Sequence, residues 1–253
     1  MTKLVTMDCK SSYRLSSMKR AGHHAIIRWL MGNFNPADIV VHKNGVEETL
    51  DDHNPYILPI NTRFNNNGNQ VRRLRGKFLA DSYIYNYEEK SPKRILNIES
   101  YSKNDSELCD IVVIRDPYNM IASRLECNFI DNQEANLPKT VALWLEYADV
   151  YLNHKQENLI CINFNAWFRD KTYRQTICAQ MGLSFLDRSR AEVARAGGGS
   201  SFDGLTYDGK AHQMDVLNRY KHYMTNALYK KYVLTNPDIK ELSHRIFGEI
   251  INA

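Results

Sequence analysis

Apolar residues along this 253-residue chain gather in short blocks, and longer stretches with helical spacing separate the blocks. The blocks at residues 94–98 (RILNI), 111–114 (IVVI) and 159–164 (LICINF) are rich in β-branched residues, which is typical of buried parallel strands. Between the last two blocks, Val141, Leu145 and Ala148 lie on one stripe of an amphipathic helix. Strands that alternate with helices predict an α/β fold, in which helices cover both faces of a parallel sheet.

The same two patterns, short apolar blocks for strands and apolar residues at helical spacing for helices, predict the remaining elements. Strands are expected at residues 13–17, 38–42, 94–98, 111–114 and 159–164. Helices are expected around residues 26–31 and at 78–87, 117–125, 138–154, 168–181, 214–233 and 237–250. Asp116 and Pro117 are the cap and first residue typical of a helix start, and Gly182 is typical of a helix end.

The chain is expected to form one domain over residues 1–253, a length that suits a single α/β domain with appendages. Residues 44–77 are rich in proline and asparagine and lack either period, so we expect an irregular insertion that faces the substrate. Residues 214–253 are expected to form a helical C-terminal part.

Composition narrows the class of ligand. The net charge of +4 fits an anionic ligand but is too small to predict a nucleic-acid-binding surface. The five cysteines share no CxxC spacing, so we expect reduced thiols and no zinc site. The N-terminus lacks the apolar run of a signal peptide, and no window resembles a transmembrane helix. A cytoplasmic protein that does not contact membranes is therefore expected.

A basic turn at residues 16–30 (SSMKRAGHHAIIRWL) is the strongest candidate for an anion site. A strand that passes through a glycine-containing turn into a helix directs free backbone N–H groups and the positive end of the helix dipole at one point. Lys19, Arg20, His23, His24 and Arg28 add side-chain donors around that point. The hydrolase motif GxxxxGK[ST] is absent. An ordinary strand-to-helix turn with solvated basic residues is the alternative.

A second candidate follows the strand at residues 111–114. Arg115 is expected at the carboxyl end of that strand, where open α/β sheets bind ligands. Ser123 lies two helical turns further on and reaches the same anion only if its helix passes close by. A salt bridge of Arg115 and a surface hydroxyl at Ser123 are the alternatives. Three glycines at 197–199 predict a loop that approaches a ligand, or else a flexible linker.

Taken in order, these stretches resemble the sulfotransferase superfamily, whose co-substrate is 3′-phosphoadenosine 5′-phosphosulfate (PAPS). Residues 20–24 (RAGHH) resemble the family loop around the 5′-phosphosulfate, and Arg115-Asp116-Pro117 with Ser123 resembles its 3′-phosphate site. Residues 162–185 resemble the strand, turn and helix that follow, and residues 198–202 the loop over the nucleotide. The resemblance implies a P-loop-like sulfotransferase fold and PAPS contacts from Lys19, Arg20, Ala21, Gly22, His23, His24, Arg115, Ser123, Phe164, Gly198, Gly199, Ser200, Ser201 and Phe202.

This chain departs from the family pattern at three places. Ala21, His23 and His24 replace the hydroxyl residues of the first loop, so imidazole and backbone donors must take over their contacts. Ala25 stands where the family has a tryptophan, so adenine must stack on another side chain. The acidic pair of the later turn reads Asn163-Phe164-Asn165.

The resemblance also implies a mechanism, which is in-line transfer of the sulfuryl group without a metal. Lys19 or Arg20 is expected to contact the leaving phosphate. Glu99, which follows the predicted strand at 94–98, and His24 are the two leading candidates for the general base, with His23 a third. The acceptor is expected to be a hydroxyl or amine of a small molecule or carbohydrate, which the sequence leaves unidentified together with the oligomeric state.

Three other classes compete with this reading. A P-loop kinase or nucleotide hydrolase shares the broad fold, but histidines stand where a magnesium-binding hydroxyl would be expected. A binding module that has kept the fold and lost the reaction is the second alternative, because the first loop is altered, and only an activity assay separates it from an enzyme. A glycosyltransferase is disfavoured because no DxD pair is present, and Asp51-Asp52 are adjacent.

Overall fold

Five parallel strands form the centre of the sheet, in the order β2-β5-β1-β6-β7. Their bounds are β1 Ser11–Ser17, β2 Val40–Asn44, β5 Ser82–Glu88, β6 Leu108–Ile114 and β7 Leu159–Asn163. The computed structural model describes residues 11–35, 40–44, 61–64, 70–74, 82–98, 108–194 and 199–251. The predicted α/β fold, a sheet flanked by helices, is confirmed.

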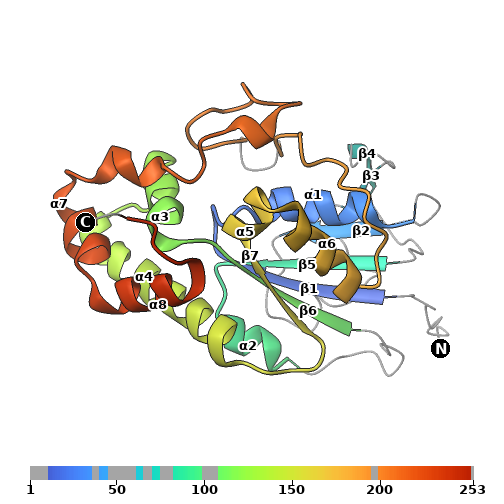
Figure 1. Cartoon of the computed structure of the whole chain (residues 1–253), viewed down its shortest axis with the longest axis horizontal. Coiled ribbons are helices and arrows are strands. Elements are labelled where there is room, and N and C mark those ends of the chain that lie inside the picture. The colour runs from blue at the N-terminus through green and yellow to red at the C-terminus, as the bar shows by residue number, and fades with distance from the viewer. Residues whose placement is uncertain are drawn as a thin grey trace, which may run out of the picture.

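Helices cover both faces of this sheet (Figure 1), with α1, α5 and α6 on one side and α2, α4 and α8 on the other. The helices are α1 His23–Asn33, α2 Pro92–Leu96, α3 Pro117–Glu126, α4 Gln133–Asn153, α5 Phe164–Arg169, α6 Lys171–Gln180, α7 Ala227–Tyr229 and α8 Pro237–Phe247. Leu15, Ile84, Ile111 and Val113 of the central strands are fully buried, because helices pack against the sheet from both sides.

Two further strands extend the sheet at the β2 edge. β3 Asn61–Phe64 pairs antiparallel with β2, and β4 Gln70–Leu74 pairs antiparallel with β3. The predicted parallel sheet thus has an antiparallel extension, and the expectation that residues 44–77 are irregular was wrong at these two strands. These strands are mostly polar, so they carry no continuous apolar block. The expected substrate-facing role of this segment stays a prediction.

The helix predicted at residues 78–87 was wrong, because this segment contains strand β5. Tyr83, Tyr85 and Tyr87 alternate with Ile84 and Asn86, and all five residues are buried in β5, which lies between β1 and β2 in the sheet. The period of two was present in the sequence, but tyrosine and asparagine in a doubly buried strand do not form an obvious apolar block.

The strand predicted at residues 94–98 was also wrong, because this segment is the end of helix α2. Ser91 caps the helix by accepting a hydrogen bond from the Arg94 amide, and Pro92 is its first residue. Serine followed by proline is a helix-start signal that precedes the apolar run. Glu99 therefore does not follow a strand of the sheet, and it lies outside the described residues.

Several helices differ from the predictions in their bounds or their continuity. α4 begins at Gln133, five residues before Pro138, and α6 begins only at Lys171 because Asp170 is extended and caps it. The single helix expected at 214–233 is broken into a 3-10 turn at Arg219–Tyr223, α7, and a π turn at Lys230–Leu234. The break falls where Asn226 adopts an extended conformation and caps α7.

The order of the parallel strands creates a crevice at their carboxyl ends. From β1 the chain crosses through α1 toward the β2 side, whereas from β6 it crosses through α3 and α4 toward β7. Neighbouring strands β1 and β6 therefore send their connections in opposite directions. Open α/β sheets bind ligands at such a switch point.

The segment that follows α6 is fixed beside α1 by Asp187. Its carboxylate accepts hydrogen bonds from Arg174 Nε and Nη2, both at 2.8 Å, and from Trp29 Nε1 at 3.0 Å. Burial raises the pKa of Asp187, but the bonds from Arg174 outweigh it and lower the pKa overall. This anchor positions residues 188–194 over the carboxyl ends of the strands.

Candidate active site

The turn between β1 and α1 has a backbone suited to bind an anion. Arg20 and Gly22 both have positive φ angles, 66° and 86°, and the Ala21 amide donates to the Met18 carbonyl at 3.1 Å. Gly22 is the residue before α1, and no side chain caps the helix N-terminus. The N-terminus of α1 therefore has no side-chain cap, and its helix dipole favours an anion at this turn.

Glu89, the residue after β5, holds this turn in place. The Lys19 amide donates to Glu89 Oε1 at 2.6 Å, and Arg124 of α3 donates to both oxygens of Glu89 at 2.6 and 2.8 Å. The Arg124 guanidinium is almost fully buried, so this is a fixed, bidentate ion pair. The turn is thereby tied to two other elements of the crevice.

Gly22→Ala is expected to disrupt this turn. An added Cβ would lie 2.1 Å from the ring of Phe164, which must then move. Gly182→Ala is the matched control, because Gly182 also has positive φ, 64°, but its Cβ meets nothing within 4 Å. Thermal unfolding should show that Gly22→Ala lowers the free energy of unfolding by about 1–3 kcal/mol more than the control does. Equal losses would show that Phe164 does not pack against the turn.

Arg115 begins the segment after β6 and turns its side chain back toward the β1 turn. Its Nη1 donates to the Arg20 carbonyl at 3.0 Å and lies 3.4 Å from Ser123 Oγ, and its Nη2 donates to the Val216 carbonyl. Its guanidinium also lies 5.0 Å from the centre of the Phe164 ring. The structure therefore brings the two sequence candidates, the basic turn and Arg115 with Ser123, into one place.

The sequence did not point to Arg219, which completes this cluster from the C-terminal part. Its Nη1 donates to Ser123 Oγ at 3.2 Å, and its Nη2 donates to Ser200 Oγ at 2.6 Å and pairs with Asp203 at 3.1 Å. Ser123 Oγ thus lies between the guanidinium groups of Arg115 and Arg219. No spacing rule links residues so far apart, so only the fold reveals Arg219.

Three arginines at one point create a strong positive potential. Burial, and then the charges of Arg219 and Arg20, lower the pKa of Arg115 to about 9, although Asp116 opposes this shift. Burial likewise lowers the pKa of Arg219 and of Arg20. Within the described part of the chain, Nε of Arg115 and Nε of Arg219 are buried without a hydrogen-bond partner. A multivalent anion would satisfy these donors and offset the repulsion.

The loop at residues 199–203 covers the same cluster. Arg20 Nη2 donates to the Gly199 carbonyl at 2.9 Å, and the Phe202 ring lies 5.1 Å from the Arg219 guanidinium carbon. Gly199 has a φ of 84° and packs so closely that a Cβ would lie 2.6 Å from the Gly204 carbonyl oxygen. Within this loop the hydroxyl of Ser201 is buried, and Gly198 lies outside the described residues.

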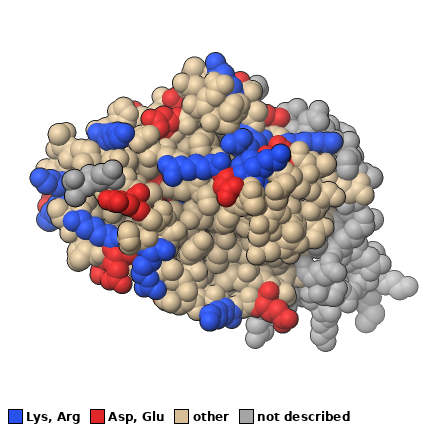
Figure 2. Space-filling view, viewed as in Figure 1, with Lys and Arg blue, Asp and Glu red and all other residues tan. Residues whose placement is uncertain are grey.

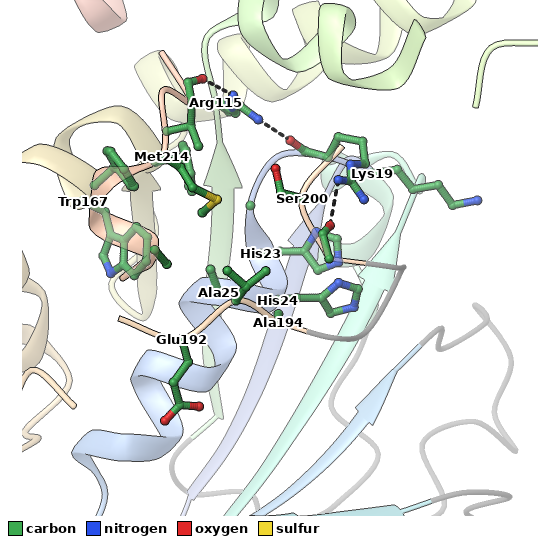
Figure 3. Close-up of a pocket in the computed structure, with 18 of the residues that line it drawn as sticks. Lys19, His23, His24, Ala25, Arg115, Trp167, Glu192, Ala194, Ser200 and Met214 are labelled. Carbon is green, nitrogen blue, oxygen red and sulfur yellow. Dashed lines mark hydrogen bonds between the residues drawn. The ribbon is translucent and has the colours of Figure 1, made fainter. Parts of the chain in front are cut away.

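These groups open into one pocket, shown in Figure 3. The sequence candidates that line it are Lys19, Arg20, Gly22, His23, His24, Arg115, Phe164, Gly199 and Ser200. Ala21, Ser123, Ser201 and Phe202 are not among the residues that line the pocket. An aromatic and aliphatic wall, not predicted from the sequence, includes Phe129, Trp167, Phe168, Val193 and Met214. A cationic end with an apolar wall suits a phosphorylated ligand that carries a flat ring.

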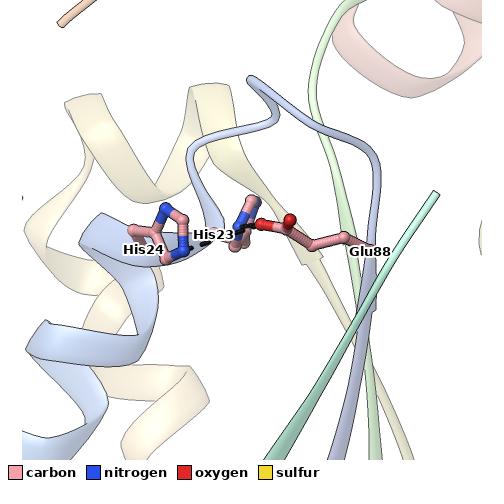
Figure 4. Close-up of side chains that lie close together, drawn as sticks. All are labelled: His23, His24 and Glu88. Atoms are coloured by element: carbon pink, nitrogen blue, oxygen red, sulfur yellow. Dashed lines mark ion pairs between the residues drawn. The ribbon is translucent and has the colours of Figure 1, made fainter. Parts of the chain in front are cut away.

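A second cluster of polar side chains lines the pocket where β5 ends beside the start of α1 (Figure 4). His23 forms an ion pair with Glu88, and His24 Nε2 lies 3.6 Å from the same Glu88 oxygen. Burial raises the pKa of Glu88, but the bond from His23 and the nearby charges of His24 and Lys19 hold it at about 2. Glu88 therefore keeps its charge throughout the neutral range. The sequence analysis did not single out Glu88, because it expected a helix at 78–87. Residues at the carboxyl ends of parallel strands are the ones expected to contact a ligand.

This chain has the fold of the sulfotransferases. It is similar to mouse sulfotransferase SULT7A1 complexed with PAP, with a TM-score of 0.54 and 13% identity over 96% of this chain and 91% of that chain. It is also similar to the sulfotransferase domain from the Synechococcus PCC 7002 olefin synthase, with a TM-score of 0.47, 13% identity and coverage of 96% and 97%. No protein-family model and no curated protein matches it. Among the described helices, none is long and apolar enough to cross a membrane.

Proposed function

We propose that this protein is a sulfotransferase that moves a sulfuryl group from PAPS to a hydroxyl or amine acceptor. The observation that carries the proposal is the meeting of Arg20, Arg115, Arg219 and Ser123 at the switch point of the sheet. Arg115, Arg219 and Ser123 suit the 3′-phosphate of a nucleotide whose 5′-phosphosulfate lies at the N-terminus of α1, beside Arg20. The sulfotransferase fold supports the same assignment.

The apolar wall supports an adenosine moiety between the two anion sites. Phe164 and Trp167 line the pocket with ring centroids 5.6 Å apart. These two rings offer a stacking surface for adenine. Ala25, which stands where the sulfotransferase family has a tryptophan, does not provide one. On the face shown in Figure 2, Lys and Arg side chains form separate groups with carboxylates among them, which favours a local anionic ligand over nucleic acid.

The pair of His24 and Glu88 is the proposed base in place of Glu99. The imidazole of His24 takes the proton from the acceptor as the acceptor oxygen or nitrogen bonds to sulfur. The bond between sulfur and the 5′-phosphate oxygen breaks, and its electron pair stays on that oxygen. Arg20, Lys19 and the first amides of α1 stabilise this charge. The Glu88 carboxylate stabilises the imidazolium that forms, without taking its proton.

A thermal-shift titration tests the nucleotide assignment. We expect 3′-phosphoadenosine 5′-phosphate (PAP) to raise the melting temperature, with about 2.7 kcal/mol of added stability at 100 times its dissociation constant. Adenosine 5′-phosphate, which lacks the 3′-phosphate, should give a much smaller shift at equal concentration. A preference for ATP with magnesium would overturn the proposal in favour of a kinase. Binding of PAP without transfer from PAPS to a panel of phenols, alcohols, amines and sugars would favour an inactive binding module.

A further inference from the structure

The three side chains of His23, His24 and Glu88 form a cluster of metal-ligating groups that the sequence did not predict. One nitrogen of each imidazole and one oxygen of the carboxylate all lie within 4.8 Å of one another. We propose that this cluster binds one divalent transition-metal ion of the zinc type. Zinc bonds of about 2.0–2.2 Å in tetrahedral geometry need donor atoms about 3.3–3.5 Å apart, so small side-chain movements suffice.

Rigid elements hold the three ligands in place. His23 and His24 are the first two residues of α1, and the Gly22 turn fixes their position. Glu88 is the last residue of β5, and its backbone pairs with Ser17 at the end of β1. The side chains are 4%, 20% and 16% exposed, so the cluster is largely shielded while His24 remains accessible. A site of this kind is preformed, because it needs no backbone rearrangement.

Buried ring nitrogens without partners point to a missing ligand. Nδ1 of His23 and Nε2 of His42 are buried and have no hydrogen-bond partner within the described residues. His42 is not a member of the cluster of donor atoms, whereas His23 is. The unpartnered Nδ1 of the buried His23 ring is therefore the second observation that indicates a ligand at this place.

The donor set selects the metal. Two imidazoles and one carboxylate suit Zn²⁺, Co²⁺ or Ni²⁺, whereas Mg²⁺ and Ca²⁺ prefer oxygen ligands. The positive end of α1 and the Lys19 ammonium oppose any cation, so weak ionic attraction alone does not suffice. Strong bonds from imidazole to a transition metal offset this repulsion. The sequence-based expectation of no zinc site rested on cysteine spacing, which says nothing about histidines.

Metal binding at this cluster would compete with the base proposed above. A metal held by His24 and Glu88 engages the nitrogen lone pair and the carboxylate that proton transfer needs. The metal-loaded protein is then inactive, and a chelator restores activity. Binding itself is independent of the proposed function, because it is measured without PAPS or an acceptor.

The test is a titration of the chelator-treated full chain with Co²⁺, followed by Zn²⁺. We expect one Co²⁺ per chain with visible absorption bands, and loss of these bands when Zn²⁺ displaces it. Glu88→Gln keeps the shape of the side chain but removes its charge, and should weaken Co²⁺ binding at least about tenfold. His24→Ala should do the same. His212→Ala, which removes an exposed histidine outside the pocket, should leave binding unchanged.

Two results would overturn the metal site. One is a wild-type protein that shows no saturable Co²⁺ absorption, and the other is equal binding by wild type and Glu88→Gln. Circular dichroism of each variant confirms that it is folded before the titration. A PAP titration of the same samples reports separately on the nucleotide site, so failure of one proposal is distinguishable from failure of the other.

Discussion

Arg115→Ala is expected to abolish detectable PAP binding. In the proposed complex the Arg115 fork donates at least two charge-assisted hydrogen bonds to a phosphate, each contributing about 1.5–3 kcal/mol. Their loss corresponds to an affinity lower by at least about 100-fold. Isothermal titration calorimetry with PAP measures this change directly. The buried Nε of Arg115, which has no partner within the described residues, indicates that the side chain is not committed to structural contacts alone.

The controls for Arg115→Ala separate binding from folding. Arg115 also donates to the carbonyls of Arg20 and Val216, so its removal leaves both acceptors unpaired. Arg115→Lys keeps the charge but loses the planar fork, and should recover only part of the affinity. Arg245→Ala removes an exposed arginine of α8 and should bind PAP as wild type does. Wild-type affinity in a folded Arg115→Ala protein would contradict the assignment of the 3′-phosphate site.

The parts of the site predicted from sequence share one property, which is that they depend on local signals. Asp116 accepts a hydrogen bond from the Asn119 amide at 2.8 Å and caps α3, as its place before Pro117 predicts. This cap fixes the direction of α3 and so brings Ser123 back over Arg115. The glycine before α1 and the basic residues around it are likewise readable within a few positions.

The parts that sequence did not reveal depend on the order of the strands. Glu88 reaches the site because β5 lies beside β1, and Arg219 reaches it because the 3-10 turn packs on α3. Neither neighbour relation follows from local periodicity. The missed cap at Ser91 and Pro92 had a further effect, because it placed Glu99 after an expected strand and so made it a candidate base beside His24. An element of the wrong type, rather than a displaced boundary, thus affected the choice of candidates.

Glu88→Gln is expected to lower kcat by about 10²–10⁴-fold while PAP binding stays close to that of wild type. Glutamine fills the same space but does not stabilise the imidazolium of His24. Removal of the carboxylate charge also favours the neutral imidazole, so the acid limb of the pH–rate profile should move about one unit lower. The measurement is PAP release from PAPS with the best acceptor of the panel, in the presence of a chelator that excludes metals from the cluster.

A matched variant distinguishes a role in proton transfer from a general effect of charge. Glu192→Gln removes another carboxylate of the pocket wall, which pairs with Arg28 rather than with an imidazole. It should leave the acid limb unmoved and change kcat far less. Because the pKa of Glu88 is held at about 2, this carboxylate does not titrate in the range of the assay. A shift of the acid limb in Glu88→Gln therefore reports on the neighbouring imidazole, and an unshifted profile with full kcat would exclude His24 and Glu88 as the base.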